Sequence, residues 1–200
     1  MDKDLQVGDI ISNSMSKGVK NLIPIAVNAV LWLLTVWIPY INIGTTIGLS
    51  VGLPAKAGRD ENISPTEIFN PVYRKQMGEY VLVSGLVNAG VGIGFALFII
   101  PGIVISIAWL LAPLFVVDKQ INPLEAINRS NSVTYGKKWT IFRAYLVIGI
   151  VIAIVIAILT AVLGLISSFL ATLVGIIAAA FAASFLISAS GYIYISLGGE

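Results

Sequence analysis

Three long stretches of this 200-residue sequence contain no charged residue, and the charged residues gather before, between and after them. The uncharged stretches are residues 21–55, 80–117 and 144–199. A helix that crosses a bilayer needs about 20 apolar residues, so each stretch is too long for one crossing and long enough for two. The sequence therefore predicts an all-α, polytopic integral membrane protein with six transmembrane helices in three helical hairpins.

Composition agrees with this class and narrows the chemistry. The chain is 58% hydrophobic and 11% charged, whereas about a quarter of the residues in a soluble domain are charged. Histidine and cysteine are both absent, which removes imidazole acid–base catalysis, thiol nucleophiles and most transition-metal ligand sets. We therefore expect no enzymatic activity and no cofactor or metal site.

The sequence predicts one membrane domain over residues 1–200, with polar segments on the membrane surface. Its parts are, in order, an interfacial helix over 1–20, a hairpin over 22–55, an interfacial segment over 64–77, a hairpin over 79–117, an interfacial helix over 122–138 and a hairpin over 141–196. Turn-forming residues mark the ends of the hairpins. These are Pro39 in the first hairpin, Pro101 and Gly102 in the second, and residues 164–168 in the third.

The distribution of charge predicts the orientation. With two crossings per uncharged stretch, all 12 Lys and Arg residues lie on one side of the membrane, and the positive-inside rule places that side in the cytoplasm. We expect a protein of the cell membrane with both termini cytoplasmic. In an alternative, residues 41–55, which are short for a span, form a re-entrant or mostly embedded segment.

Three polar segments show features of surface helices. Val7, Ile11, Met15 and Val19 recur at four-residue spacing, which predicts an amphipathic helix near the N-terminus. Ser64-Pro65-Thr66-Glu67 and Asn122-Pro123-Leu124-Glu125 each combine an N-cap residue, proline at the first helical position and glutamate at the third. Each of these motifs predicts the start of a short helix.

Basic residues gather where each polar segment meets the membrane. They are Lys17, Lys20, Arg74, Lys75, Lys137 and Lys138. In one interpretation they only orient the chain and extend to the lipid phosphates; in the other they attract anionic lipids. Membrane lipids, anionic ones included, are the expected partners. We expect no nucleic acid partner, because charges spread over three junctions form no continuous basic stripe.

Small residues at regular spacing predict close helix packing. Gly44, Gly48 and Gly52 form a glycine zipper, in which another backbone can approach closely. Other small-residue rows contain Gly92, Gly149 and Gly175. In one interpretation these faces pack within one molecule. In the other, the Gly44 face joins copies of the chain into a homo-oligomer.

Two amide side chains, Asn28 and Asn88, lie inside predicted spans. The ordinary interpretation is a hydrogen bond between helices, and the alternative is a conduction path. Ion and proton pathways usually contain ionisable groups within the membrane, and the uncharged stretches have none.

Several motifs together resemble one known family. They are Val7-Gly8-Asp9-Ile10-Ile11, Ile100-Pro101-Gly102-Ile103, Leu111-Ala112-Pro113, Val116-Val117-Asp118, Pro123-Leu124-Glu125-Ala126-Ile127-Asn128-Arg129-Ser130 and Tyr192-Ile193-Tyr194. They resemble the glycerophosphoryl diester phosphodiesterase membrane-domain superfamily and its stand-alone relatives. The resemblance implies a six-helix membrane unit, a hairpin turn at Pro101 and Gly102, a cytoplasmic exit at Asp118 and an interfacial helix over residues 122–130. No catalytic residue is carried over.

The leading functional hypothesis is a non-enzymatic, multispan membrane protein that self-associates or acts as a scaffold and shapes or organises the bilayer. The alternative is an oligomeric channel or transporter for a small solute. A third class, an intramembrane lipid enzyme, would need a paired nucleophile and base, and the sequence shows no such pair.

Overall fold

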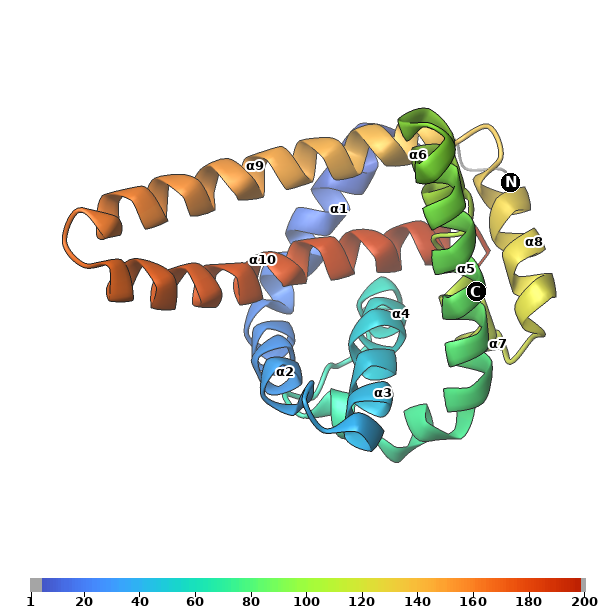
Figure 1. Ribbon diagram of the computed structural model, residues 1–200, viewed down its shortest axis with the longest axis horizontal. Helices are drawn as coiled ribbons and strands as arrows, with labels where there is room; N and C mark the ends of the chain where they lie inside the picture. Colours follow the sequence, from blue (N-terminus) through green and yellow to red (C-terminus); the bar gives the residue numbers. More distant parts are fainter. Residues whose placement is uncertain (1–4, 199–200) are drawn as a thin grey trace.

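The computed structural model describes residues 5–198 and contains helices but no strand over that range (Figure 1). Its α-helices are α1 (Val7–Lys20), α2 (Leu22–Thr35), α3 (Pro39–Ile47), α4 (Leu53–Gly58), α5 (Met77–Leu97), α6 (Ile99–Ala108), α7 (Ala112–Lys119), α8 (Pro123–Thr134), α9 (Lys138–Gly164) and α10 (Ser168–Ser196). A π-helical turn, η1 (Gly48–Gly52), joins α3 to α4, and the 3-10 helices η2 (Glu67–Phe69) and η3 (Pro71–Gln76) precede α5. Residues 1–4 of the predicted first interfacial helix lie outside the described range.

Several helices are long and apolar enough to cross a membrane, which confirms the all-helical membrane class. Four qualify in the described part of the chain: Pro71–Leu97, Ile99–Lys119, Lys138–Gly164 and Ser168–Ser196. Counting α1 and α2, which meet at 80°, as one span raises the number to five. The sequence predicts six spans, and the shortfall lies in the first hairpin, because α2 has only 14 residues and rises about 21 Å.

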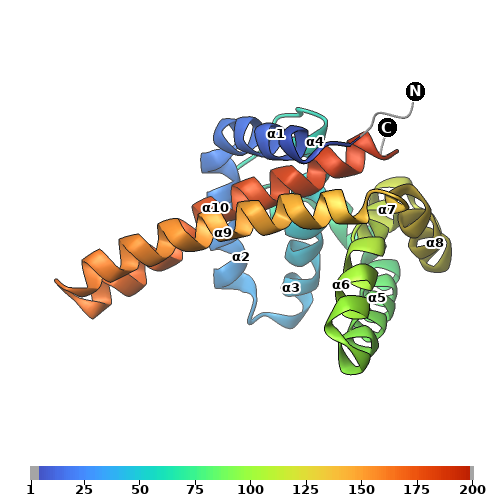
Figure 2. The same cartoon turned by 90° about the horizontal axis from the view of Figure 1, so that it is seen from above.

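The helices are organised around α10, which packs against α1, α2, α4 and α9. Figure 2 shows α1 lying across the upper side, together with the end of α10. The turns between α2 and α3, α5 and α6, and α9 and α10 all lie toward the lower side of that view. The α9–α10 pair reaches far beyond the other helices in both views (Figures 1 and 2).

The turn of the second hairpin differs from the predicted one. The helix breaks at Phe98, which is extended with φ −160°, and Pro101 and Gly102 lie within the first turn of α6. Proline is tolerated there because the first amides of a helix have no intrahelical acceptor. Gly102 instead packs against α5, where a Cβ added to Gly94 would lie 3.0 Å from the Gly102 Cα. Pro39 follows the first break and begins α3, and the third break falls at residues 165–167.

Of the two predicted N-cap motifs, one begins an α-helix in the structure and the other does not. Asn122 caps α8, since its Oδ1 accepts a hydrogen bond from the Leu124 amide at 2.9 Å. The segment over residues 64–77 forms no α-helix before Met77; instead Asn70 caps η3 by accepting from the Val72 amide at 3.1 Å. The motif at Ser64 is followed by the short 3-10 helix η2 rather than by an α-helix, and Asn70 and Pro71 begin the next element.

The N-terminal helix α1 buries the first half of its apolar stripe, since Val7 and Ile11 pack partly against the core. Ile10, Ser14 and Gly18 are its buried residues, whereas Met15 and Val19 are exposed. The Ser14 hydroxyl donates to the Phe185 carbonyl of α10 at 2.6 Å. Ser14 and Gly18 therefore pack closely on α10, and the second half of the apolar stripe, Met15 and Val19, stays exposed.

Candidate functional site

The glycine zipper is filled from within the same molecule. A Cβ added to Gly48 would lie 2.7 Å from the Cα of Ile68, and one added to Gly52 would overlap the ring of Tyr73. At Gly44 an added Cβ would lie 3.2 Å from the Cγ of Arg74. The chain's own residues therefore occupy this face, which favours the interpretation of packing within one molecule.

Asn28 holds the polar connector against α2. Its Nδ2 donates to the carbonyl of Ser64 at 2.7 Å and to that of Pro24 at 2.8 Å, and its Oδ1 accepts from the amide of Ile68 at 3.0 Å. The side chain is fully buried. Its hydrogen-bonding groups are thus used structurally, which argues against a place for Asn28 in a conduction path.

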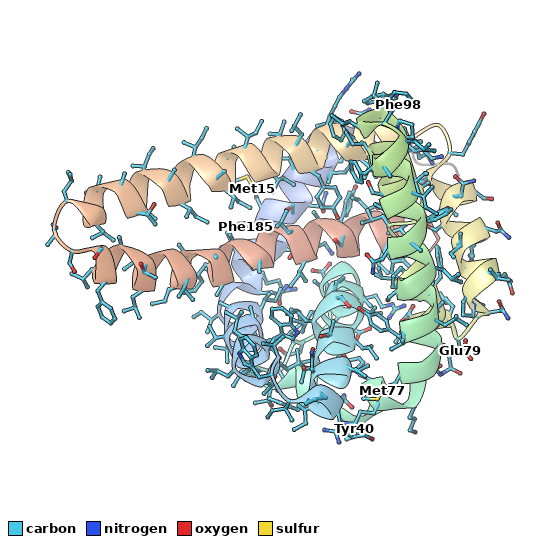
Figure 3. The ribbon with its side chains drawn as sticks, in the orientation of Figure 1. Met15, Tyr40, Met77, Glu79, Phe98 and Phe185 are labelled. Carbon is cyan, nitrogen blue, oxygen red and sulfur yellow. The ribbon has the colours of Figure 1, made fainter. Side chains whose placement is uncertain are left out.

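This contact also limits the depth of the first hairpin. At about 1.5 Å per residue, α2 extends only about 10 Å beyond Asn28 to its end at Thr35. Met77, at the start of α5, lies against Gly44 of α3, and Figure 3 shows Tyr40 and Met77 near the same edge of the molecule. The hydrocarbon core is about 30 Å thick. The α2–α3 hairpin therefore extends only a short way past the polar connector.

A three-residue cluster links the ends of α4, α7 and α10. The Arg59 guanidinium donates to both carboxylate oxygens of Asp118, through Nη1 at 2.9 Å and through Nη2. Tyr194 donates its hydroxyl to the same carboxylate at 2.6 Å. The Tyr194 ring packs edge-on against Phe115 with centroids 5.2 Å apart, and Arg129 of α8 lies 4.8 Å over the Phe115 ring. The cluster therefore connects four helices.

A second cluster surrounds the buried carboxylate of Glu67. Lys56 of α4 lies 2.9 Å from it, and Tyr73 and Asn70 donate to it at 3.0 and 3.3 Å. Burial by itself raises the pKa of the Glu67 carboxyl, but the hydrogen bonds from Lys56 and Tyr73 outweigh it and hold that pKa below its usual value. Glu67 is therefore an ionised, fully partnered anchor of the connector.

A third cluster ties α1 to the end of α4. Lys17 donates to Asp60 at 2.6 Å and to the carbonyl of Gly58 at 2.8 Å, and Lys20 lies 3.2 Å from Asp60. The hydrogen bond from Lys17 holds the pKa of Asp60 below its usual value. The Lys17 side chain is only 12% exposed. It therefore caps α4 at the end where helix carbonyls favour cations.

The other basic residues predicted to face lipid lie in varied surroundings. Lys20, Arg74 and Lys75 are exposed, while Lys137 and Lys138 are half-buried. Lys138 donates to the Asn131 side chain at 2.9 Å. Lys75 differs from the rest because it lines a cavity together with residues of α4 and α7.

That cavity, of about 260 Å³, lies between α4, η3 and α7. Its charged walls are Lys56, Arg59, Glu61, Lys75 and Asp118. A larger cavity of about 450 Å³ lies between α1, α9 and α10, where Figure 3 shows Met15 and Phe185, and its walls are almost wholly apolar. The smaller cavity therefore brings together charged groups from separate parts of the chain.

The remaining predicted residues, Gly92, Gly149, Gly175 and Asn88, lie on α5, α9 and α10. A Cβ added to Gly175 of α10 would lie 3.1 Å from the Cγ2 of Thr160, which is a packing contact with α9. A Cβ added to Gly92 of α5 or to Gly149 of α9 would have no neighbouring atom within 4 Å. Asn88 of α5 is exposed, and its amide forms no hydrogen bond within residues 5–198.

Reasoning from the sequence did not identify Arg59, Glu67 or Tyr194 as site residues, and it placed Asp118 only as the end of a span. Arg59 and Asp118 are 59 positions apart, and Tyr194 and Asp118 are 76 apart. No local spacing rule links residues at such separations. One signal was that Arg59, Asp118 and Tyr194 each lie close to the end of an uncharged stretch.

No family model matches this chain, and no curated protein and no solved structure matches it.

Proposed function

We propose that this protein is a non-enzymatic membrane protein that self-associates through the exposed face of α5 and organises the bilayer around the assembly. The observation that carries the proposal is Asn88. Its amide is exposed near the middle of an apolar helix and has no hydrogen-bond partner within the described residues. In hydrocarbon an unsatisfied polar group costs several kcal/mol, so a partner outside the monomer is favoured.

A second copy of the chain is a suitable partner for this face. An amide side chain is both donor and acceptor, so two copies of Asn88 satisfy each other across a two-fold axis. Gly85 and Gly92 lie one helical repeat on either side of Asn88, and both have open space where a Cβ would lie. Small residues beside a polar one are the typical composition of a helix interface in membranes.

The proposed membrane arrangement has four crossings and one embedded hairpin. The helical segments Pro71–Leu97, Ile99–Lys119, α9 and α10 cross, α2 and α3 enter and return, and α1 lies on the surface. Both termini are then on one side, which the positive-inside rule makes the cytoplasm of a cell membrane. The embedded hairpin and α1 add volume to that leaflet only, and such an asymmetric insertion favours a curved bilayer.

Replacing Asn88 by Leu should weaken self-association about 3- to 30-fold, the range expected for the loss of one hydrogen bond between membrane helices. Single-molecule photobleaching in vesicles at graded protein density measures the dimer fraction. Gly149→Leu adds a side chain to an equally open glycine of α9 and should leave the dimer fraction unchanged. A wild-type protein that stays monomeric at every density would contradict the proposal.

Labelling from each side of the membrane tests the arrangement of the first hairpin. Because the chain has no cysteine, single cysteines can replace Tyr40, Phe98, Leu165 and Lys20. With a membrane-impermeant maleimide we expect Phe98 and Leu165 to react from the outside, Lys20 from the cytoplasmic side and Tyr40 from neither side. Reaction of Tyr40 from the outside at the rate of Phe98 would restore the six-span topology.

A further inference from the structure

The charged cavity between α4, η3 and α7 is lined by residues of two ion pairs and by two further charged residues, Lys75 and Glu61. Asp118 is bound by Arg59, and Lys56 is bound to Glu67, so neither pair leaves a net charge. Lys75 and Glu61 also line the cavity, both are exposed, and neither forms an ion pair within residues 5–198. The cavity therefore offers one ammonium and one carboxylate to a ligand.

We propose that this cavity binds the headgroup of a zwitterionic phospholipid that carries a primary amine, with its phosphate at Lys75 and its ammonium at Glu61. The inference deepens the membrane placement proposed above and rests on it. The cavity lies where the ends of α4 and α7 meet the polar connector, which is the level of the lipid phosphates in that placement. The cavity also has apolar walls next to the charged ones, formed by Val51, Val72 and Val117. A lipid, which has both a polar and an apolar part, needs both kinds of wall.

The chemistry of the walls favours ethanolamine over the other common headgroups. A primary ammonium has three N–H donors for a carboxylate, whereas the quaternary ammonium of choline has none and is typically recognised by a cage of aromatic faces. Tyr73 is the aromatic residue of this lining, and its hydroxyl is bound to Glu67. An anionic headgroup without an amine would leave Glu61 unmatched.

Native mass spectrometry can test the assignment with protein released from nanodiscs. The nanodiscs contain equal parts of phosphatidylethanolamine, phosphatidylcholine and phosphatidylglycerol. We expect phosphatidylethanolamine to be retained about tenfold more than phosphatidylcholine, as for one charge-assisted hydrogen-bonded pair. Glu61→Gln should remove that preference, and Lys75→Gln should reduce retention of all three lipids. Lys138→Gln, whose ammonium binds Asn131 outside the cavity, is the matched control and should leave the preference for phosphatidylethanolamine over phosphatidylcholine unchanged.

Other results would overturn the inference. Equal retention of the three lipids, or a preference for phosphatidylglycerol that Glu61→Gln leaves intact, would mean general attraction between charges. Displacement of the retained lipid by millimolar inorganic phosphate would assign the cavity to a soluble phosphate compound. The dimer fraction is measured in a separate experiment, by photobleaching in vesicles with Asn88→Leu, so a failure of the lipid assignment is distinguishable from a failure of self-association.

Discussion

Gly191→Ala is expected to destabilise the fold by about 3 kcal/mol, the upper end of the usual range for overpacking. Gly191 of α10 crosses α4 at a contact between two backbones. A Cβ added there would overlap the carbonyl oxygen of Pro54 and lie 2.8 Å from the amide nitrogen of Gly58. Backbone atoms have no alternative rotamer, so the added methyl group must push the two helices apart.

The effect should appear as a lower midpoint of unfolding by SDS in mixed micelles. Gly149→Ala is the matched control, because it adds the same methyl group to a membrane helix where nothing lies within 4 Å. That variant should be neutral or more stable, since alanine is the better helix former. Equal midpoints for Gly191→Ala and the wild type would show that α4 and α10 do not cross closely.

Asp118→Leu is the second large expected effect. Its carboxylate accepts hydrogen bonds from Arg59 and Tyr194, and its side chain is only 15% exposed. Removing it takes away the one carboxylate that the partly buried guanidinium and the buried hydroxyl share as an acceptor. Breaking a buried pair by removing one partner costs about 3 to 5 kcal/mol, and the 31% exposure of the Arg59 side chain places the expected loss near the lower bound, about 3 kcal/mol.

Tyr194→Phe separates the two halves of this cluster. It removes one hydrogen bond to a charged group and keeps the ring against Phe115, so a loss of about 1.5 kcal/mol is expected. In the double variant the two losses should not add, because both act on the same carboxylate. Full additivity in the SDS unfolding assay would contradict the shared hydrogen-bond network.

The elements that could be predicted depend on neighbouring residues. Asn122 followed by Pro123 identifies the start of α8, because capping depends on atoms within one turn. The breaker-rich stretch 164–168 contains the observed break between α9 and α10. Pro101 indicated a turn, whereas it lies in the first turn of α6. Proline disfavours a helix interior but is common both in turns and in the first turn of a helix, and the sequence alone does not distinguish these two places.

The depth of the first hairpin could not be predicted for a different reason. The mean hydropathy of a segment is calculated as if lipid surrounded the whole segment. In the folded chain the polar connector covers part of α2 and α3, since Asn28 binds Ser64 and Ile68, and Gly48 contacts Ile68. The same packing uses the glycine zipper within one molecule, and it leaves the face of α5 that carries Asn88 uncovered.

The order of the amino acids alone determined that this chain is a helical membrane protein, because the free energy of placing a segment in lipid is close to a sum over its own side chains. The tertiary structure decided how far each segment enters and which charges meet. The pairing of Arg59 with Asp118, the capping of α4 by Lys17 and the cavity lined by Lys75 and Glu61 all join residues distant in the chain. Electrostatic attraction and close packing depend on distances in space, and only the folded chain establishes those distances.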